Sequence, residues 1–361
     1  MKPLYFNKLD SLRFWAFFLV FWYHGFRDCF SGLTDNTTIT TIINSLLTTG
    51  GVGVHIFFVI SGFLITYLLI REFDMHKTIS IKNFYLRRVL RIWPLYYLVL
   101  GTGIFLLPHL LDTFQFNGSL LKNLLFFNNF DMLSEPTSAN IGITWSVAIE
   151  EQFYLFWPLL FAVFYKKDLL PYVCGGIWLF SVAYILLTDP FTAYFHTFGN
   201  LNYLMTGCFG AWLFARYHSF IMDAKWLSAG SFMLGILVIV ATIILKNFYP
   251  FFGYVYLLLP FVYLGFVFYL VRISDNKETL VFSKLGKYTY GMYLYHPAVL
   301  IVLRKMFWLV NPDYYKARSL NLLLALIALS LTIGLSILSY EYFEKIFLRL
   351  KRKVSTIETR I

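Results

Sequence analysis

The sequence predicts an all-α fold, a polytopic membrane bundle of about ten transmembrane helices with both termini in the cytosol. Three observations support this prediction. The 361 residues are 59% hydrophobic and only 14% charged, with a mean hydropathy of +0.66, whereas about a quarter of the residues in a soluble domain are charged. The apolar residues fall into helix-length runs. Lys and Arg residues gather beside alternate ends of these runs.

Ten apolar segments are long enough to be candidates for crossing a ~30 Å hydrocarbon core. They are residues 9–27, 51–70, 85–107, 144–164, 169–187, 198–216, 227–246, 251–271, 286–304 and 320–342. We find no internal repeat and no soluble domain. We therefore expect residues 1–345 to form one transmembrane domain and residues 346–361 a basic cytosolic tail. No small-residue cleavage site follows the first segment, so we expect an uncleaved span rather than a signal peptide.

Charge placement predicts the orientation. With the N-terminus in the cytosol, 23 of the 30 Lys and Arg residues lie on the cytosolic side and 7 on the outer side. This positive-inside bias predicts an even number of spans. The net charge of +11 then reflects topology and contact with membrane lipids, not nucleic-acid binding. The three cysteines have neither metal-ligand nor disulfide spacing, so we expect no metal site.

The first span reads LDSLRFWAFFLVFWYHGF over residues 9–26 and contains a cation, Arg13, and an imidazole, His24. Their separation along a straight α-helix is roughly 16 Å, about half of the hydrocarbon core. Polar groups inside a membrane segment are costly and are functional candidates by default. We therefore take both as site residues, with Arg13 at the cytosolic end and His24 in the outer half.

The third span begins with an arginine cluster. Arg88 and Arg91 are three positions apart and share a helical face. Guanidinium groups bind phosphate through paired hydrogen bonds. We expect Arg88 and Arg91, together with Arg13, to bind an anionic ligand at the inner membrane surface, although positive-inside anchoring is the alternative. For Arg87 we favour that anchoring role.

The fourth span carries two adjacent carboxylates, Glu150 and Glu151. Ser146, Glu150 and Tyr154 follow at i, i+4 and i+8 on one face, and Glu151 points about 100° away. We place Glu150 at the depth of the first-span histidine, where a carboxylate can orient an imidazole and raise its basicity. Structural pairing with an arginine or with backbone donors is the alternative. Glu151 is a candidate for substrate binding.

Three further polar or aromatic residues are candidate site residues. Ser61 follows the glycine-rich start of the second span and either contacts ligand or bonds to its own helix, while the glycines themselves predict close helix packing. His296 lies near mid-membrane in the ninth span, as a second site group or as a core histidine. Trp145, at the start of the fourth span, is a candidate for substrate binding. His55 is read as structural.

Six motifs occur in a fixed order: Arg13-x10-His24, GVGVHIFFVISGFLI, RRVLRIWPLYY, TWSVAIEEQFYLFWP, YGMYLYHP and SYEYFEKIFL. This order resembles the acyltransferase family 3 membrane proteins, and the resemblance covers almost the whole chain. It implies a bacterial O-acyltransferase of carbohydrates in the inner membrane that uses cytosolic acyl-CoA. It also implies that His24 is catalytic and that Arg13, Arg88 and Arg91 are the family's arginines. Where many members have an acidic residue in the second-span motif, this chain has His55.

Together these readings predict transfer of an acyl group, most simply acetyl, from acyl-CoA to a carbohydrate hydroxyl. The arginines would bind the anionic end of coenzyme A, and its arm would span the roughly 16 Å to the first-span histidine. His24 would act as general base, oriented by Glu150. An acyl-histidine intermediate is left open.

Some family members carry an additional esterase-like domain. This sequence ends soon after the tenth span, so we expect a lone transferase acting on the O-antigen of lipopolysaccharide, on exopolysaccharide or on a lipid-linked sugar. The competing interpretation is a transporter or flippase of a lipid-linked sugar or small organic ion, with His and Glu as a proton relay. Homo-oligomerisation is left open.

Overall fold

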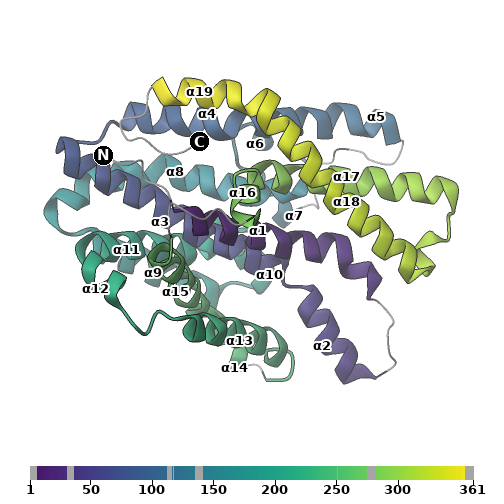
Figure 1. The fold of residues 1–361 in the computed structure, drawn as a ribbon, viewed down its shortest axis with the longest axis horizontal. Helices are drawn as coiled ribbons and strands as arrows, with labels where there is room; N and C mark the ends of the chain where they lie inside the picture. The colour runs from purple at the N-terminus through teal and green to yellow at the C-terminus, as the bar shows by residue number, and fades with distance from the viewer. Residues whose placement is uncertain are drawn as a thin grey trace.

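The computed structural model describes residues 6–30, 36–111, 116, 118–134, 141–249, 251–274 and 281–353. Within these ranges the regular structure is helical and contains no strand, which confirms the predicted class. The longest helices lie side by side in a bundle (Figure 1).

The α-helices are α1 (Asn7–Phe21), α2 (Thr37–Leu47), α3 (Gly50–His76), α4 (Ile81–Gly101), α5 (Leu107–Leu111), α6 (Leu120–Leu124), α7 (Asp131–Ser134), α8 (Trp145–Phe164), α9 (Leu170–Leu187), α10 (Pro190–Phe195), α11 (Thr197–Arg216), α12 (His218–Asp223), α13 (Ala229–Leu245), α14 (Phe251–Val255), α15 (Leu259–Arg272), α16 (Val281–Gly286), α17 (Thr289–Val310), α18 (Arg318–Ser339) and α19 (Lys345–Lys353). Three π-helical segments are η1 (Trp22–Phe26), η3 (Thr102–Leu106) and η8 (Tyr340–Glu344). The 3₁₀ segments are η2 (Arg27–Cys29), η4 (Gly142–Thr144), η5 (Tyr165–Lys167), η6 (Tyr256–Leu258) and η7 (Tyr314–Lys316).

Each of the ten predicted spans falls on a helix. In the described part of the chain, 7 helical stretches are long and apolar enough to cross a membrane. They are Thr37–His76, Ile81–His109, Gly142–Lys167, Leu170–Leu187, Gly253–Arg272, Thr289–Val310 and Arg318–Lys351. The chain is therefore a multi-pass membrane protein.

The other three predicted spans correspond to α1, α11 and α13, which fall outside these 7 stretches. Helix α13 is apolar but has only 17 residues. Helix α1 has 15 residues, and its apolar run is interrupted by Asp10 and Arg13. The number of helices that cross the membrane and the cytosolic placement of both termini stay predictions from charge and length.

Glycine packing joins the helices at the centre of the bundle. A Cβ atom on Gly62 of α3 would lie 2.1 Å from the carbonyl oxygen of Leu204 in α11. A Cβ atom on Gly207 of α11 would lie 2.2 Å from the carbonyl oxygen of Val59 in α3. The two backbones therefore touch where each helix lacks a side chain, a common way for membrane helices to associate. The close packing predicted from the second-span glycines is confirmed.

The C-terminal helices α18 and α19 are continuous through a π-helical segment. Helix α18 passes through the π-helical segment η8 into α19, which packs along α4 (Figure 1). A π-helical segment inserts an extra residue into a helical turn and redirects the helix that follows. Residues 346–353 of the predicted cytosolic tail are thus packed against the bundle, whereas residues 354–361 lie outside the described residues.

Candidate active site

Five helices, α1, α3, α4, α8 and α17, surround a cavity of about 130 Å³. We call it the arginine cavity. Its polar lining consists of Arg13, Ser61, Arg88, Arg91, Ser146, Glu150, Tyr154, Thr289, Tyr290 and Tyr293, and the remaining lining side chains are apolar. The charged lining therefore comprises three guanidinium groups and one carboxyl group.

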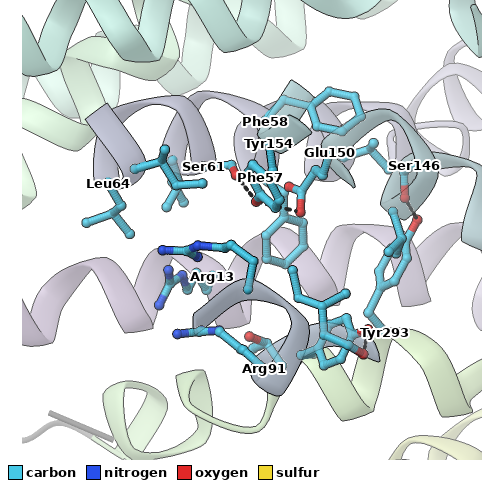
Figure 2. Close-up of a pocket in the computed structure, with 18 residues that line it drawn as sticks. Arg13, Phe57, Phe58, Ser61, Leu64, Arg91, Ser146, Glu150, Tyr154 and Tyr293 are labelled. Carbon is cyan, nitrogen blue, oxygen red and sulfur yellow. Dashed lines mark hydrogen bonds between the residues drawn. The ribbon is translucent and has the colours of Figure 1, made fainter. Parts of the chain in front are cut away.

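The three arginines are held in different ways. Arg13 forms an ion pair with Asp10 at 2.8 Å, one turn earlier on α1. Arg88 lies over the rings of Phe84 and Tyr154, and its Nε has no hydrogen-bond partner among the described residues. Arg91 is solvent-accessible. Figure 2 shows the guanidinium groups of Arg13 and Arg91 on the same side of the cavity.

Arg87 faces another direction. Its guanidinium forms an ion pair with the buried Glu72 of α3 at 2.8 Å, and Arg87 does not line the cavity. The second carboxylate oxygen of Glu72 accepts a hydrogen bond from the backbone N–H of Ser80, the N-cap residue of α4. This pairing ties the end of α3 to the start of α4, so a structural role for Arg87 agrees with the geometry.

The polar face predicted for the fourth span is confirmed, because Ser146, Glu150 and Tyr154 all line the arginine cavity. The Tyr154 hydroxyl donates to the Glu150 carboxylate at 3.0 Å and shares a hydrogen bond with Ser61 of α3. Glu151 points away, as its spacing predicted, and accepts a hydrogen bond from Trp93 at 2.8 Å. Glu150 thus hydrogen-bonds to a tyrosine, and within the described residues it forms no hydrogen bond with His24.

Tyr293 and Ser146 form the wall of the cavity that lies away from the guanidinium groups (Figure 2). Their hydroxyl oxygens are 2.7 Å apart, and the Tyr293 hydroxyl also lies 3.1 Å from the carbonyl oxygen of Ile143. Both side chains are buried. Tyr293 was not singled out from the sequence, although it lies within the YGMYLYHP motif.

His24 lies in the π-helical segment η1 at the end of α1 and does not line the arginine cavity. Arg304 of α17 supports this segment. One of its terminal nitrogens donates to the carbonyl oxygen of His24 and to the carboxylate of Asp28, each at 3.0 Å. Since π-helical segments frequently occur at functional sites, the local backbone is a second indication, beside residue type, that His24 belongs to a site.

The ring of His24 contacts the ring of its chain neighbour Tyr23 and the ring of His296 in α17. The centroids of the two imidazole rings are 5.3 Å apart, with an angle of 47° between the planes. His296 is fully buried, and its Nδ1 lies 2.7 Å from the carbonyl oxygen of Tyr293. We call His24 and His296 the histidine pair. The ring of Tyr293 is 5.9 Å from that of His296, so Tyr293 contacts one member of the histidine pair and also lines the arginine cavity.

Seven of the nine predicted site residues therefore fall into two adjoining groups. The arginine cavity collects Arg13, Ser61, Arg88, Arg91 and Glu150, and the histidine pair collects His24 and His296. Trp145 belongs to neither. Its buried ring packs against the rings of Tyr194 and Phe195. His55 stacks on Tyr203 at 3.9 Å, away from both groups.

Sequence reasoning missed one cation. Lys351 of α19 is half-buried and lies within electrostatic range of Arg13, Arg88 and Arg91. Its neighbour two positions earlier, Arg349, is exposed. Nothing in the local pattern of this basic helix distinguishes the two, because the packing of α19 along α4 decides which cation lies near the arginines.

Residues 6–341 match the family described as "Acyltransferase domain". The peptidoglycan O-acetyltransferase OatA of Listeria monocytogenes is 28% identical over 309 residues, which is 74% of this chain and 48% of that protein. A Bacillus subtilis protein, YrhL, provisionally named as a peptidoglycan O-acetyltransferase, is 26% identical over 389 residues, or 94% of this chain and 54% of that protein.

A third relative, from Staphylococcus aureus strain COL and provisionally named as an O-acetyltransferase, is 27% identical over 83% of this chain and 53% of its own length. The chain thus spans about half the length of the curated relatives it matches. No solved structure matches the chain significantly. The match over residues 6–341 includes both halves of the candidate site, and the chain belongs to the acyltransferase domain family, also called acyltransferase family 3.

Proposed function

We propose that this chain is a membrane O-acyltransferase that moves an acyl group, acetyl in the simplest case, from acyl-CoA to a hydroxyl of an envelope carbohydrate. The observation that carries the proposal is the arginine cavity, in which three guanidinium groups face one carboxyl group inside an apolar bundle. Membership of the acyltransferase domain family supports the reaction class.

The excess of guanidinium groups suits an anionic donor. Within the part of the chain that the structure describes, the Nε–H of Arg88 has no hydrogen-bond partner, and Arg91 is accessible to a ligand. Guanidinium groups hydrogen-bond to phosphate oxygens in a fixed planar geometry. The phosphates of coenzyme A would bind at these arginines, and the pantetheine arm would extend toward Ser61 and Glu150. The hydroxyl and carboxyl groups there can bond to the amide groups of the arm.

The chemistry would take place at the histidine pair. His24, as general base, takes the proton of the acceptor hydroxyl, and the oxygen of that hydroxyl bonds to the acyl carbon. The bond from the acyl carbon to sulfur breaks, and the proton passes from His24 to the thiolate that leaves. Tyr293 lines the arginine cavity and its ring contacts that of His296, so we infer that its side chain moves when the acyl end of the donor reaches His24.

The acceptor is proposed from the relatives. Two of them are named for peptidoglycan O-acetylation, so a peptidoglycan-type sugar is the first acceptor to test, ahead of O-antigen or exopolysaccharide. A carbohydrate outside a bacterial inner membrane would approach His24 from the outer side. The predicted orientation, with the arginines facing the cytosol, gives donor and acceptor separate routes to the site.

The test uses the purified chain in lipid nanodiscs with acetyl-CoA and a disaccharide fragment of peptidoglycan. We expect release of free CoA in proportion to the alkali-labile acetyl ester formed, and little release without the sugar. Absence of CoA release, while cells that express the chain still acquire acetyl esters, would overturn acyl-CoA as the donor. Movement of the disaccharide into liposomes without ester formation would favour the transporter interpretation.

A further inference from the structure

His296 has a defined tautomer. Its Nδ1 lies 2.7 Å from the carbonyl oxygen of Tyr293 and 3.3 Å from that of Met292. Carbonyl oxygens only accept hydrogen bonds, so Nδ1 carries the proton. The Nε2 of a neutral ring then has a free lone pair. Within the part of the chain that the structure describes, this Nε2 has no hydrogen-bond partner, although the residue is 0% exposed.

An unpartnered acceptor in a buried position is unusual, because native structures pair nearly all buried polar atoms. The side chains in ring contact with His296 are mostly those of Phe and Tyr. The aromatic rings of Phe17, Phe21 and Tyr293 pack around the imidazole. The other ring in contact is that of His24, whose centroid is 5.3 Å away. At this spacing a nitrogen of one ring can approach a nitrogen of the other to hydrogen-bonding distance.

We propose that His296 is a positioning residue for His24. Its Nε2 accepts a hydrogen bond from one ring N–H of His24, which fixes the tautomer and orientation of that ring. The other ring nitrogen of His24 is then unprotonated and faces the acceptor hydroxyl. This inference rests on the proposed function, in which His24 is the base.

The hydrogen bond also has a role during the reaction. When His24 takes the proton of the hydroxyl, its ring becomes an imidazolium with both nitrogens protonated. The Nε2 lone pair of His296 then accepts a bond from a charged donor, and such bonds are stronger than those between neutral groups. The proton leaves His24 with the thiolate of the donor, and both rings return to their starting state. His296 therefore gains and loses no proton.

The backbone shape near His24 agrees with this arrangement. The π-helical segment η1 shifts the residues that follow α1 relative to a continuous α-helix. Arg304, two turns beyond His296 on α17, donates to the carbonyl oxygen of His24 at 3.0 Å. Two residues of α17 thus contact His24: Arg304 binds its backbone carbonyl, and His296 contacts its ring. These two contacts hold the two imidazoles together.

The test replaces His296 by Phe, which keeps a ring and removes the acceptor, and by Gln, whose amide oxygen can accept from His24. We expect H296F to lower kcat about 100-fold or more, the usual size of a general-base effect, with the KM for acetyl-CoA little changed. H296Q should recover a substantial part of the lost rate. The pH profile of kcat in H296F should differ from that of the wild type. The profile of H296Q should be closer to that of the wild type.

His55 provides the matched control. It is also a buried histidine with an unpartnered ring nitrogen among the described residues, yet it stacks on Tyr203 and does not contact His24. We expect H55F to keep the wild-type pH profile even if its unfolding temperature falls. A wild-type kcat and pH profile in H296F would overturn the inference, as would equal loss of activity and thermal stability in H296F and H296Q. An active H24A variant would instead overturn the proposed function.

Discussion

The backbone carbonyl of Tyr293 lies 2.7 Å from Nδ1 of His296, while the phenol of the same tyrosine lines the arginine cavity. One turn of α17 therefore contacts both halves of the candidate site. Tyr293 therefore contacts His296 through its backbone and the arginine cavity through its side chain.

The first prediction concerns the arginines of α4. Arg88→Gln and Arg91→Gln should each weaken CoA binding by about 10- to 100-fold, because a hydrogen bond to a charged group contributes ~1.5–3 kcal/mol. The wild-type affinity should fall as salt concentration rises, and the variants should show a smaller dependence. Isothermal titration calorimetry with CoA, in detergent and at several salt concentrations, measures the affinity and its salt dependence.

Arg87→Gln is the control for this series, since Arg87 pairs with Glu72 outside the cavity. We expect it to lower the unfolding temperature while leaving the CoA affinity of the folded protein close to that of the wild type. CoA affinity unchanged in both R88Q and R91Q would remove the arginine cavity as the donor site.

The second prediction concerns the cation on α19. Lys351→Gln should weaken CoA binding about fivefold, the upper range for a partly exposed charge pair, because Lys351 lies near the guanidinium groups of the cavity. Arg349→Gln, on the exposed face of the same helix, should bind CoA like the wild type. Equal affinities for the two variants would show that α19 contributes no charge to the donor site.

The third prediction concerns the contact between α3 and α11. Gly62→Ala should destabilise the protein by about 1–3 kcal/mol, as expected for overpacking, since the added Cβ would lie 2.1 Å from a backbone oxygen. Gly265→Ala, in a helix position with nothing within 4 Å, should be neutral or stabilising by up to about 1 kcal/mol. Thermal unfolding in detergent compares the two, and a Tm of G62A at or above that of G265A would argue against the close packing.

Much of this structure could be predicted from the sequence because the patterns are local. All ten predicted spans are helical, since helix-length apolar runs have few other solutions in a membrane. Ser146, Glu150 and Tyr154 line one cavity because i, i+4 spacing places side chains on one face regardless of the neighbours. Arg87 and Arg88 are adjacent in sequence, however, and only the packing of α3 shows that one pairs with Glu72 while the other faces the cavity.

The neighbour of His24 could not be predicted in the same way. Estimated depth in the membrane placed Glu150 level with His24, but depth does not determine which helices face each other. The structure instead brings α17 to this position, more than 270 residues along the chain, and the π-helical segment at His24 has no sequence signature comparable to an apolar repeat. The separation of roughly 16 Å between Arg13 and His24 assumed a continuous α-helix, whereas residues 22–26 are π-helical.

The most direct test of the account is the activity of His24→Ala. Acetyl transfer from acetyl-CoA to the peptidoglycan disaccharide and binding of CoA are measured on the same nanodisc preparation. We predict that the variant folds, binds CoA with near wild-type affinity and forms no ester above background. Ester formation by H24A at the wild-type rate would contradict the central claim that this imidazole carries the transfer.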